Sequence, residues 1–143
     1  MKPDIKDKLF PGIQSFCGAA GRWSCYAFCI LKIAQEITGH TFSPITEIIA
    51  AIDAGFIKYN WDNAEDPDNL YVEAPAAWLS KLTGRRWTVQ KTYTKPETKY
   101  EQYLVEVWNN AHFRLTDWES LQYSYSVANG IITSWREFTP IGG

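Results

Sequence analysis

The stretch "GRWSCYAFCILKIAQEITGH", residues 21 to 40, places Ser24 and Cys25 at the start of a long apolar run. Ser24 belongs to the residue types that cap helix N-termini, and residues 25–38 contain neither glycine nor proline. Gly39 follows at the position where a helix-ending glycine is expected. Because few polar side chains interrupt this run, a helix over 25–38 must be covered on most of its sides. The sequence therefore predicts a central helix.

Two shorter helices and a set of strands are expected downstream. Residues 43–54 and 74–83 show apolar residues at helical spacing, and residues 60–69 between them form an acidic, turn-rich loop that is a candidate groove wall. Stretches rich in β-branched and aromatic residues predict strands at 86–94, 103–108, 112–117 and 130–138. Helices followed by a meander of strands indicate an α+β domain, with the central helix packed on a C-terminal antiparallel sheet.

Composition limits the classes of function. The 143 residues fit a single domain, residues 1–143, and a content of 15% aromatic residues favours a dense core or a binding groove. A net charge of −2 without any run of Lys or Arg leads us to expect neither nucleic acid nor a membrane surface as a partner. No apolar stretch has the length of a signal peptide or a membrane span, so a cytoplasmic location is expected. The oligomeric state stays open.

The cysteines are expected to be reduced thiols. Their number, three, is odd, and the chain shows no export signal, which favours thiols over a disulfide framework. Cys17, Cys25, Cys29 and His40 lack the paired spacing of zinc ligands. We therefore expect neither a metal nor a cofactor.

Cys25 is the candidate nucleophile. It occupies the first position of the predicted central helix, where unpaired N–H groups and the helix dipole favour a thiolate. The alternative is a structural thiol, because Cys29, Ile33 and Ile37 continue the same stripe along the helix. The sequence leaves both roles open.

Only two histidines are available as a base. His40 stands at the far end of the same helix, roughly 22 Å from Cys25 at the helical rise per residue, and is too distant. His112 opens a predicted strand in the sheet region, where a central helix can bring its N-terminus. An edge-strand or core histidine is the alternative role for His112.

A third group would orient the imidazole. Asp117 and Glu119 are the nearby carboxylates, and Gln122 and Asn129 are amide alternatives. On a regular strand Asp117 points to the face opposite His112, whereas Glu119 follows a turn and has more freedom. Glu119 is the preferred candidate, although each acid also fits a solvated loop.

Two stretches resemble papain-family cysteine peptidases. "SCYAF", residues 24–28, is similar to their active-site stretch, and "AHFRLTD", residues 111–117, resembles their histidine strand. With the hairpin-like "SVANGIITSWREF", residues 126–138, the layout resembles small papain-like domains of bacteria and phage related to bacteriocin-processing peptidases. The resemblance implies a papain-like fold, in which Cys25 is the nucleophile and His112 the base.

The same resemblance assigns supporting residues. It implies a following acid as the third member of a triad, here Glu119 or Asp117, and an upstream glutamine that helps to form the oxyanion hole. Gln14 is the only upstream glutamine and stands farther from Cys25 than is usual in that family. "CGAAG", beginning at Cys17, is similar to the start of the bacteriocin-processing group, but its glycines would interrupt a helix. Cys17 therefore ranks behind Cys25.

The expected function is that of a cysteine-dependent hydrolase or acyl transferase acting on an amide bond of a peptide or protein substrate. Aromatic side chains near the predicted site suit an extended chain in a groove: Trp23, Tyr26, Trp118 and Trp135. One alternative is a catalytically inactive papain-like domain that binds a protein partner through this groove. The other is a purely structural or assembly protein.

Overall fold

The structure is a computed structural model that describes residues 24–59, 70–97, 99, 101–110, 112–115 and 130–142. Both helices and antiparallel strands occur in it, which confirms the predicted α+β class. The elements are α3 (Cys25–Thr38), α4 (Pro44–Ala54), β1 (Ile57–Tyr59), β2 (Leu70–Val72), α5 (Pro75–Thr83), β3 (Trp87–Thr92), β4 (Tyr103–Trp108), β5 (His112–Leu115) and β6 (Ile132–Pro140).

Helix α3 has the bounds that the sequence predicts. Gly39 adopts the left-handed conformation with φ of 75°, and its N–H donates to the Gln35 carbonyl to close the last turn. At the other end the Ser24 carbonyl accepts the Phe28 N–H at 2.9 Å, as expected of a residue in the N-cap position. The Ser24 hydroxyl, however, is buried and has no hydrogen-bond partner among the described residues. Ser24 therefore stands at the predicted position without capping the helix through its side chain.

The other two helices are also confirmed, each beginning one residue later than predicted. Pro44 and Pro75 occupy their first turns, where the missing N–H and the fixed φ of proline cost nothing. Gly55 and Gly84 end them in the left-handed conformation. Ser43 and Ala74, the first residues of the predicted ranges, lie in the flanking N-cap positions.

The predicted strands pair in an order that the sequence did not indicate. The four-stranded sheet has the order β3-β6-β4-β5, with every neighbouring pair antiparallel. The predicted meander is wrong, because the last strand, β6, pairs with both β3 and β4 and separates them. Strands β1 and β2, which were not predicted, form a second, two-stranded antiparallel sheet. Residues 116–117, at the end of the strand predicted over 112–117, lie outside the described residues.

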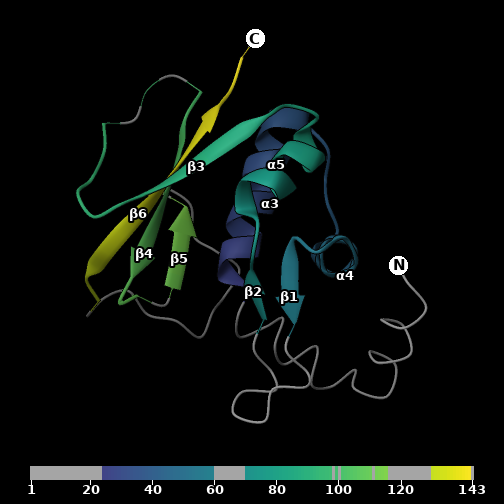
Figure 1. Ribbon diagram of the computed structural model, residues 1–143, viewed down its shortest axis with the longest axis horizontal. Coiled ribbons are helices and arrows are strands. Elements are labelled where there is room, and N and C mark those ends of the chain that lie inside the picture. The colour runs from purple at the N-terminus through teal and green to yellow at the C-terminus, as the bar shows by residue number, and fades with distance from the viewer. Residues whose placement is uncertain are drawn as a thin grey trace.

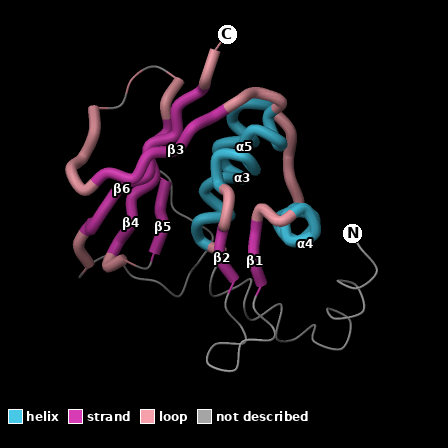
Figure 2. Tube along the Cα trace, viewed as in Figure 1, coloured by secondary structure: helices cyan, strands magenta, loops and turns pink. Residues whose placement is uncertain are grey.

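The three described helices lie on one side of the four-stranded sheet (Figures 1 and 2). Figure 1 shows α3 between that sheet and α4, with α5 beside α3 near the start of β3. Helix α3 contacts β5, α5 and α4, which is the central position that its apolar surface predicted. The buried core that results includes Ile30 and Ile33 of α3, Ile48 of α4, Trp78 and Leu79 of α5, and Val105, Leu115 and Phe138 of the sheet.

The side chains of β6 alternate between the two faces of the sheet. Phe138 is fully buried and makes an edge contact with Tyr26 of α3, so it defines the face toward the helices. Arg136, two residues earlier, shares that face. In the neighbouring strand Lys91 pairs directly with Arg136, and in β5 the Phe113 ring lies beneath the Arg136 guanidinium at 5.5 Å. This helix-facing side of the sheet forms one wall of the site.

Candidate active site

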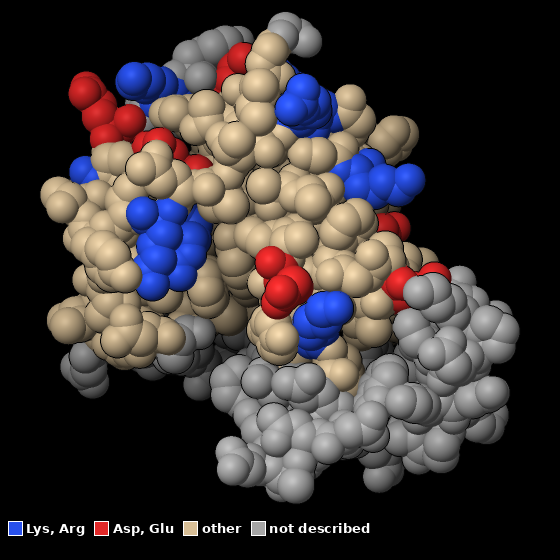
Figure 3. All heavy atoms as spheres, in the orientation of Figure 1, with Lys and Arg blue, Asp and Glu red and all other residues tan. Residues whose placement is uncertain are grey.

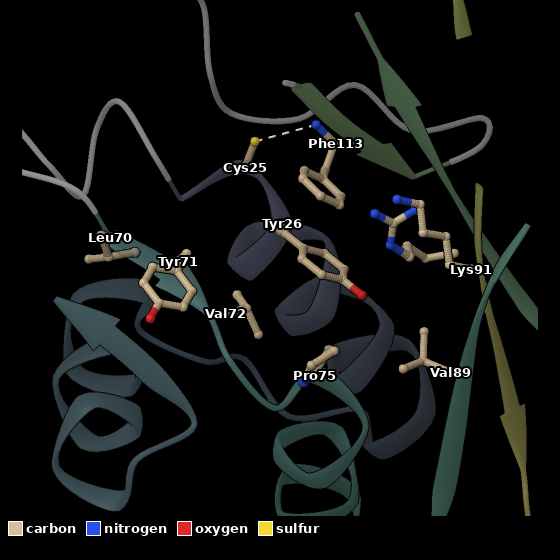
Figure 4. Close-up of a pocket in the computed structure, with 10 residues that line it drawn as sticks. Cys25, Tyr26, Leu70, Tyr71, Val72, Pro75, Val89, Lys91 and Phe113 are labelled. Carbon is tan, nitrogen blue, oxygen red and sulfur yellow. Dashed lines mark hydrogen bonds between the residues drawn. The ribbon is translucent and has the colours of Figure 1, made fainter. Parts of the chain in front are cut away.

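Cys25 lies where the first turn of α3 meets the edge of the sheet. The backbone N–H of Phe113, in edge strand β5, donates a hydrogen bond to the Cys25 Sγ at 3.3 Å. An edge strand has N–H groups that its single neighbour does not use, and each needs a partner when it is buried. The Cys25 thiol is the partner of one of them (Figure 4).

Cys29 repeats this arrangement one turn deeper. The backbone amide of Leu115 interacts with the Cys29 thiol and lowers its pKa, although burial, the larger effect, raises that pKa far above its ordinary value. One helical turn rises about 5.4 Å, and two strand residues span about 6.7 Å, so the two thiols match alternate amides of β5. Both cysteines are therefore part of the helix–sheet contact.

His112 is the first residue of β5 and is buried, with 6% of its surface exposed. Its backbone is joined to the Phe113 nitrogen that contacts the sulfur, so the His112 Cα lies within about 6 Å of the Cys25 Sγ. Phe113 stacks on the Tyr26 ring of α3 at 4.2 Å, and strand alternation sends the His112 side chain to the opposite side of β5. The structure therefore places the backbone of His112 beside the Cys25 sulfur.

The electrostatic setting of Cys25 differs from the sequence expectation. Burial raises the pKa of its thiol above the ordinary value, and N–H groups of Phe113, Tyr26 and Cys25 itself oppose the rise without overcoming it. The helix N-terminus thus acts in the predicted direction, but desolvation is the larger effect. A thiolate at Cys25 consequently requires a base to take the proton.

A pocket of about 420 Å³ opens beside Cys25. Figure 4 shows Cys25 on one side of the Tyr26 and Phe113 rings and Val89 and Lys91 on the other. Most of its lining is apolar, and Arg136 and Lys91 supply its cationic part. The lining residues are Cys25, Tyr26, Leu70, Tyr71, Val72, Pro75, Val89, Lys91, Phe113 and Arg136.

Of the predicted site residues, the structure brings Cys25, Tyr26 and the backbone of the His112 strand together. The other candidates lie outside the described residues: Gln14, Cys17, Trp23, Asp117, Trp118 and Glu119. Trp135 is described, but alternation in β6 puts it on the face opposite Arg136, away from this pocket. It is not among the residues that line the pocket beside Cys25.

Several lining residues were missed by the sequence reasoning. Leu70 and Val72 belong to β2, which follows the predicted groove-wall loop directly and is too short to show a strand pattern. Lys91 and Arg136 meet only because β6 pairs with β3, a long-range register that local patterns do not contain. Phe113 was detectable, since it follows the candidate histidine in the strand.

Among the described residues, no three His, Cys, Asp or Glu side chains gather closely enough to hold a metal ion. No helix in the described ranges has both the length and the apolar character needed to cross a bilayer.

Comparisons with protein-family models, with curated proteins and with solved structures gave no match to this chain. The likeness to papain-family peptidases therefore rests on the short stretches around Cys25 and His112. Function has to be argued from the site itself.

Proposed function

We propose that this protein is a papain-like cysteine-dependent hydrolase or acyl transferase that acts on an amide bond of a peptide or protein in the cytoplasm. The observation that carries the proposal is the 3.3 Å hydrogen bond from the Phe113 N–H to the Cys25 Sγ. It holds the thiol beside the backbone of His112 and at the rim of a pocket of about 420 Å³. A nucleophile, a neighbouring base and a substrate cavity are the parts that such chemistry needs.

In the proposed reaction, His112 takes the proton from the Cys25 thiol as the sulfur attacks the carbonyl carbon. The imidazolium then donates this proton to the leaving amine, and the acyl group remains on sulfur as a thioester. Water or a second amine attacks the thioester and releases the thiol. The backbone N–H of Cys25 is an oxyanion donor in this scheme, with Gln14 as the second donor and Glu119 as the group that orients His112.

The raised pKa of Cys25 determines which kind of activation is proposed. A thiol that burial keeps protonated at neutral pH is activated by its base during attack, as in serine enzymes, and not by a preformed thiolate. The reactivity of Cys25 at neutral pH should then depend on His112. This dependence separates the proposal from a structural thiol.

The test is the alkylation rate of Cys25 by iodoacetamide, followed by peptide mass mapping between mildly acidic and alkaline pH. We expect His112→Gln to slow the labelling of Cys25 at neutral pH by at least about tenfold, the lower limit of a general-base contribution. The difference should disappear above the pKa of the thiol, where no base is needed. His40→Gln is the matched control, because His40 is exposed and follows the far end of α3. Equal rates in the wild type and His112→Gln would refute the proposal.

One set of observations favours a second candidate, a catalytically inactive papain-like domain that binds a protein partner. Cys25 and Cys29 both interact with amides of β5, and burial raises the pKa of both thiols. Those are properties of structural cysteines. For this candidate the labelling of Cys25 rises only in the alkaline range and is the same in the His112→Gln variant.

A further inference from the structure

Two cations face each other across the β3–β6 pair at the end of the pocket away from Cys25. Lys91 and Arg136 are direct cross-strand partners, and both line the pocket. Like charges at directly opposed positions destabilise a sheet. Neither residue forms a salt bridge with a carboxylate in the part of the chain that the structure describes. Figure 3 shows a group of basic side chains over β3 and β6 with uncharged surface around it.

The Arg136 guanidinium is positioned by the protein and retains unused donors. Its Nη1 donates to the Ser134 hydroxyl at 3.0 Å and to the Trp135 carbonyl at 3.3 Å, and its Cζ lies over the Phe113 ring at 5.5 Å. These contacts leave the other guanidinium nitrogens available for a ligand. An arginine held in this way binds a carboxylate with little loss of side-chain entropy.

The buried hydroxyl of Tyr26 also points toward the end of the pocket formed by Val89 and Lys91 (Figure 4). Tyr26 is 8% exposed, and its phenol oxygen has no hydrogen-bond partner among the described residues. Figure 4 shows this oxygen directed away from Cys25, toward the end of the pocket formed by Val89 and Lys91. Burial raises the pKa of the phenol, and the charge of Arg136 opposes the rise, so the hydroxyl is a neutral donor close to that cation. A buried hydroxyl without a partner costs free energy unless a ligand satisfies it.

A short peptide can span the distance between the Arg136 guanidinium and the Cys25 thiol. The contacts from the Cys25 Sγ to the Phe113 amide and from the Phe113 ring to the Arg136 guanidinium place the two groups no more than about 14 Å apart. An extended peptide covers that distance in roughly four residues. The pocket wall also includes the apolar side chains of Leu70 and Val72 from β2 and of Pro75 from α5.

We propose that the far end of the pocket binds the carboxylate of an acidic residue in the peptide substrate, between Arg136 and Lys91 and with the Tyr26 hydroxyl as a further donor. The acidic residue lies one to three positions from the bond that Cys25 attacks. This specificity rests on the proposed function, since it assumes that Cys25 receives the substrate. The apolar wall contacts the methylene groups and neighbouring side chains of the same peptide.

The probes are short peptidyl chloromethyl ketones, which alkylate a thiol with loss of chloride. Each carries a single glutamate at the first, second or third position from the reactive carbon, and each has a twin in which glutamine replaces that glutamate. The rate of labelling at Cys25 is measured by mass mapping. For at least one pair we expect the glutamate probe to react at least about tenfold faster, which is the size of a charge-assisted hydrogen-bond pair. High salt should reduce this preference.

Three variants locate the source of the preference. Arg136→Gln should bring the glutamate-to-glutamine ratio close to one, and Lys91→Gln, which changes an exposed side chain, should reduce it partly. Tyr26→Phe removes only the hydroxyl, keeps the stack on Phe113 and should also reduce the ratio. The matched control is Arg86→Gln, an exposed cation that does not line the pocket, and it should leave the ratio unchanged.

The outcomes separate this proposal from the proposed function. Ratios within twofold for every probe pair in the wild type would overturn the acidic specificity, even if the labelling of Cys25 still depended on His112. A ratio that persists in both Arg136→Gln and Lys91→Gln would overturn it as well. If labelling is independent of His112 but the glutamate preference is present and sensitive to Arg136, the acid site stands and the catalytic role fails.

Discussion

The first and second turns of α3 each place a cysteine against strand β5, but the surroundings of the two cysteines differ. Cys25 contacts the Phe113 amide at the rim of a pocket, and Cys29 lies fully buried near the Leu115 amide. Contact with the sheet edge and a raised pKa are common to both thiols, so neither property identifies a nucleophile. The features that belong to Cys25 alone are the pocket and the adjoining backbone of His112.

The largest difference between Cys25 and Cys29 is expected in thiol labelling, when each thiol is removed separately. Cys25→Ser should abolish labelling of the native protein by iodoacetamide at neutral pH, because Cys25, of the two thiols that the structure describes, is the one beside the backbone of His112, the proposed base. Cys29→Ala should leave the labelling of Cys25 intact. Mass mapping of the labelled peptides provides the measurement, and labelling of Cys17 or Cys29 before Cys25 in the wild type would show that the nucleophile is misassigned.

The next comparison concerns the group that orients His112. Glu119→Gln should preserve folding but disturb the imidazole tautomer, and thereby slow the labelling of Cys25 by about an order of magnitude or more. Asp117→Asn should have a smaller effect, because in the strand that the sequence predicts over 112–117 this side chain points to the face opposite His112. Labelling of Cys29, measured under mildly denaturing conditions, should be the same in both variants. Equal and negligible effects on Cys25 would favour a Cys–His dyad or an inactive, partner-binding domain.

Local signals in the sequence were sufficient for α3. Helix-forming residues run without interruption from Cys25 to Thr38, and Gly39 is needed for the left-handed C-cap, so both ends follow from neighbouring residues. The Ser24 side chain was not predictable in the same way, because its burial under the rest of the fold decides that it makes no capping bond. Cys25 and His112 were selected as a pair by residue type and by the family resemblance.

The pairing of strands that are far apart in the chain could not be predicted from the sequence. The register that sets Lys91 opposite Arg136 depends on β6 inserting between β3 and β4, and hairpin signals report only neighbouring strands. Strands of three residues such as β1 and β2 are too short for a two-residue period to stand out. The apolar and cationic walls of the pocket were therefore missed, although its thiol end was found.

The two thiols should also differ in their effect on stability. Cys29→Ala deletes a fully buried side chain from the core and should lower the free energy of unfolding by about 1 kcal/mol. Cys25→Ala should cost less, because Cys25 borders a pocket into which neighbouring groups and water can relax. Urea unfolding followed by tryptophan fluorescence measures both values. A larger loss for Cys25→Ala would mean that the thiol at the pocket rim is the more important structural contact.

The smallest effect expected is on the pH dependence of stability. Burial raises the folded-state pKa of Cys29, whereas in the unfolded chain the thiol keeps its ordinary pKa of about 9. Above that pH the unfolded state loses a proton that the folded state retains, so the free energy of unfolding must fall as the pH rises. Between about pH 8 and pH 9 each such thiol contributes a loss of only a few tenths of a kcal/mol.

Cys29→Ala should flatten this decline. Cys25→Ala should flatten it by the same amount or less, because three backbone N–H groups limit the rise in its pKa. If Cys25→Ala reduced the pH dependence of the free energy of unfolding more than Cys29→Ala does, Cys25 would be the more desolvated thiol. The distinction between the two turns of α3 would then be reversed.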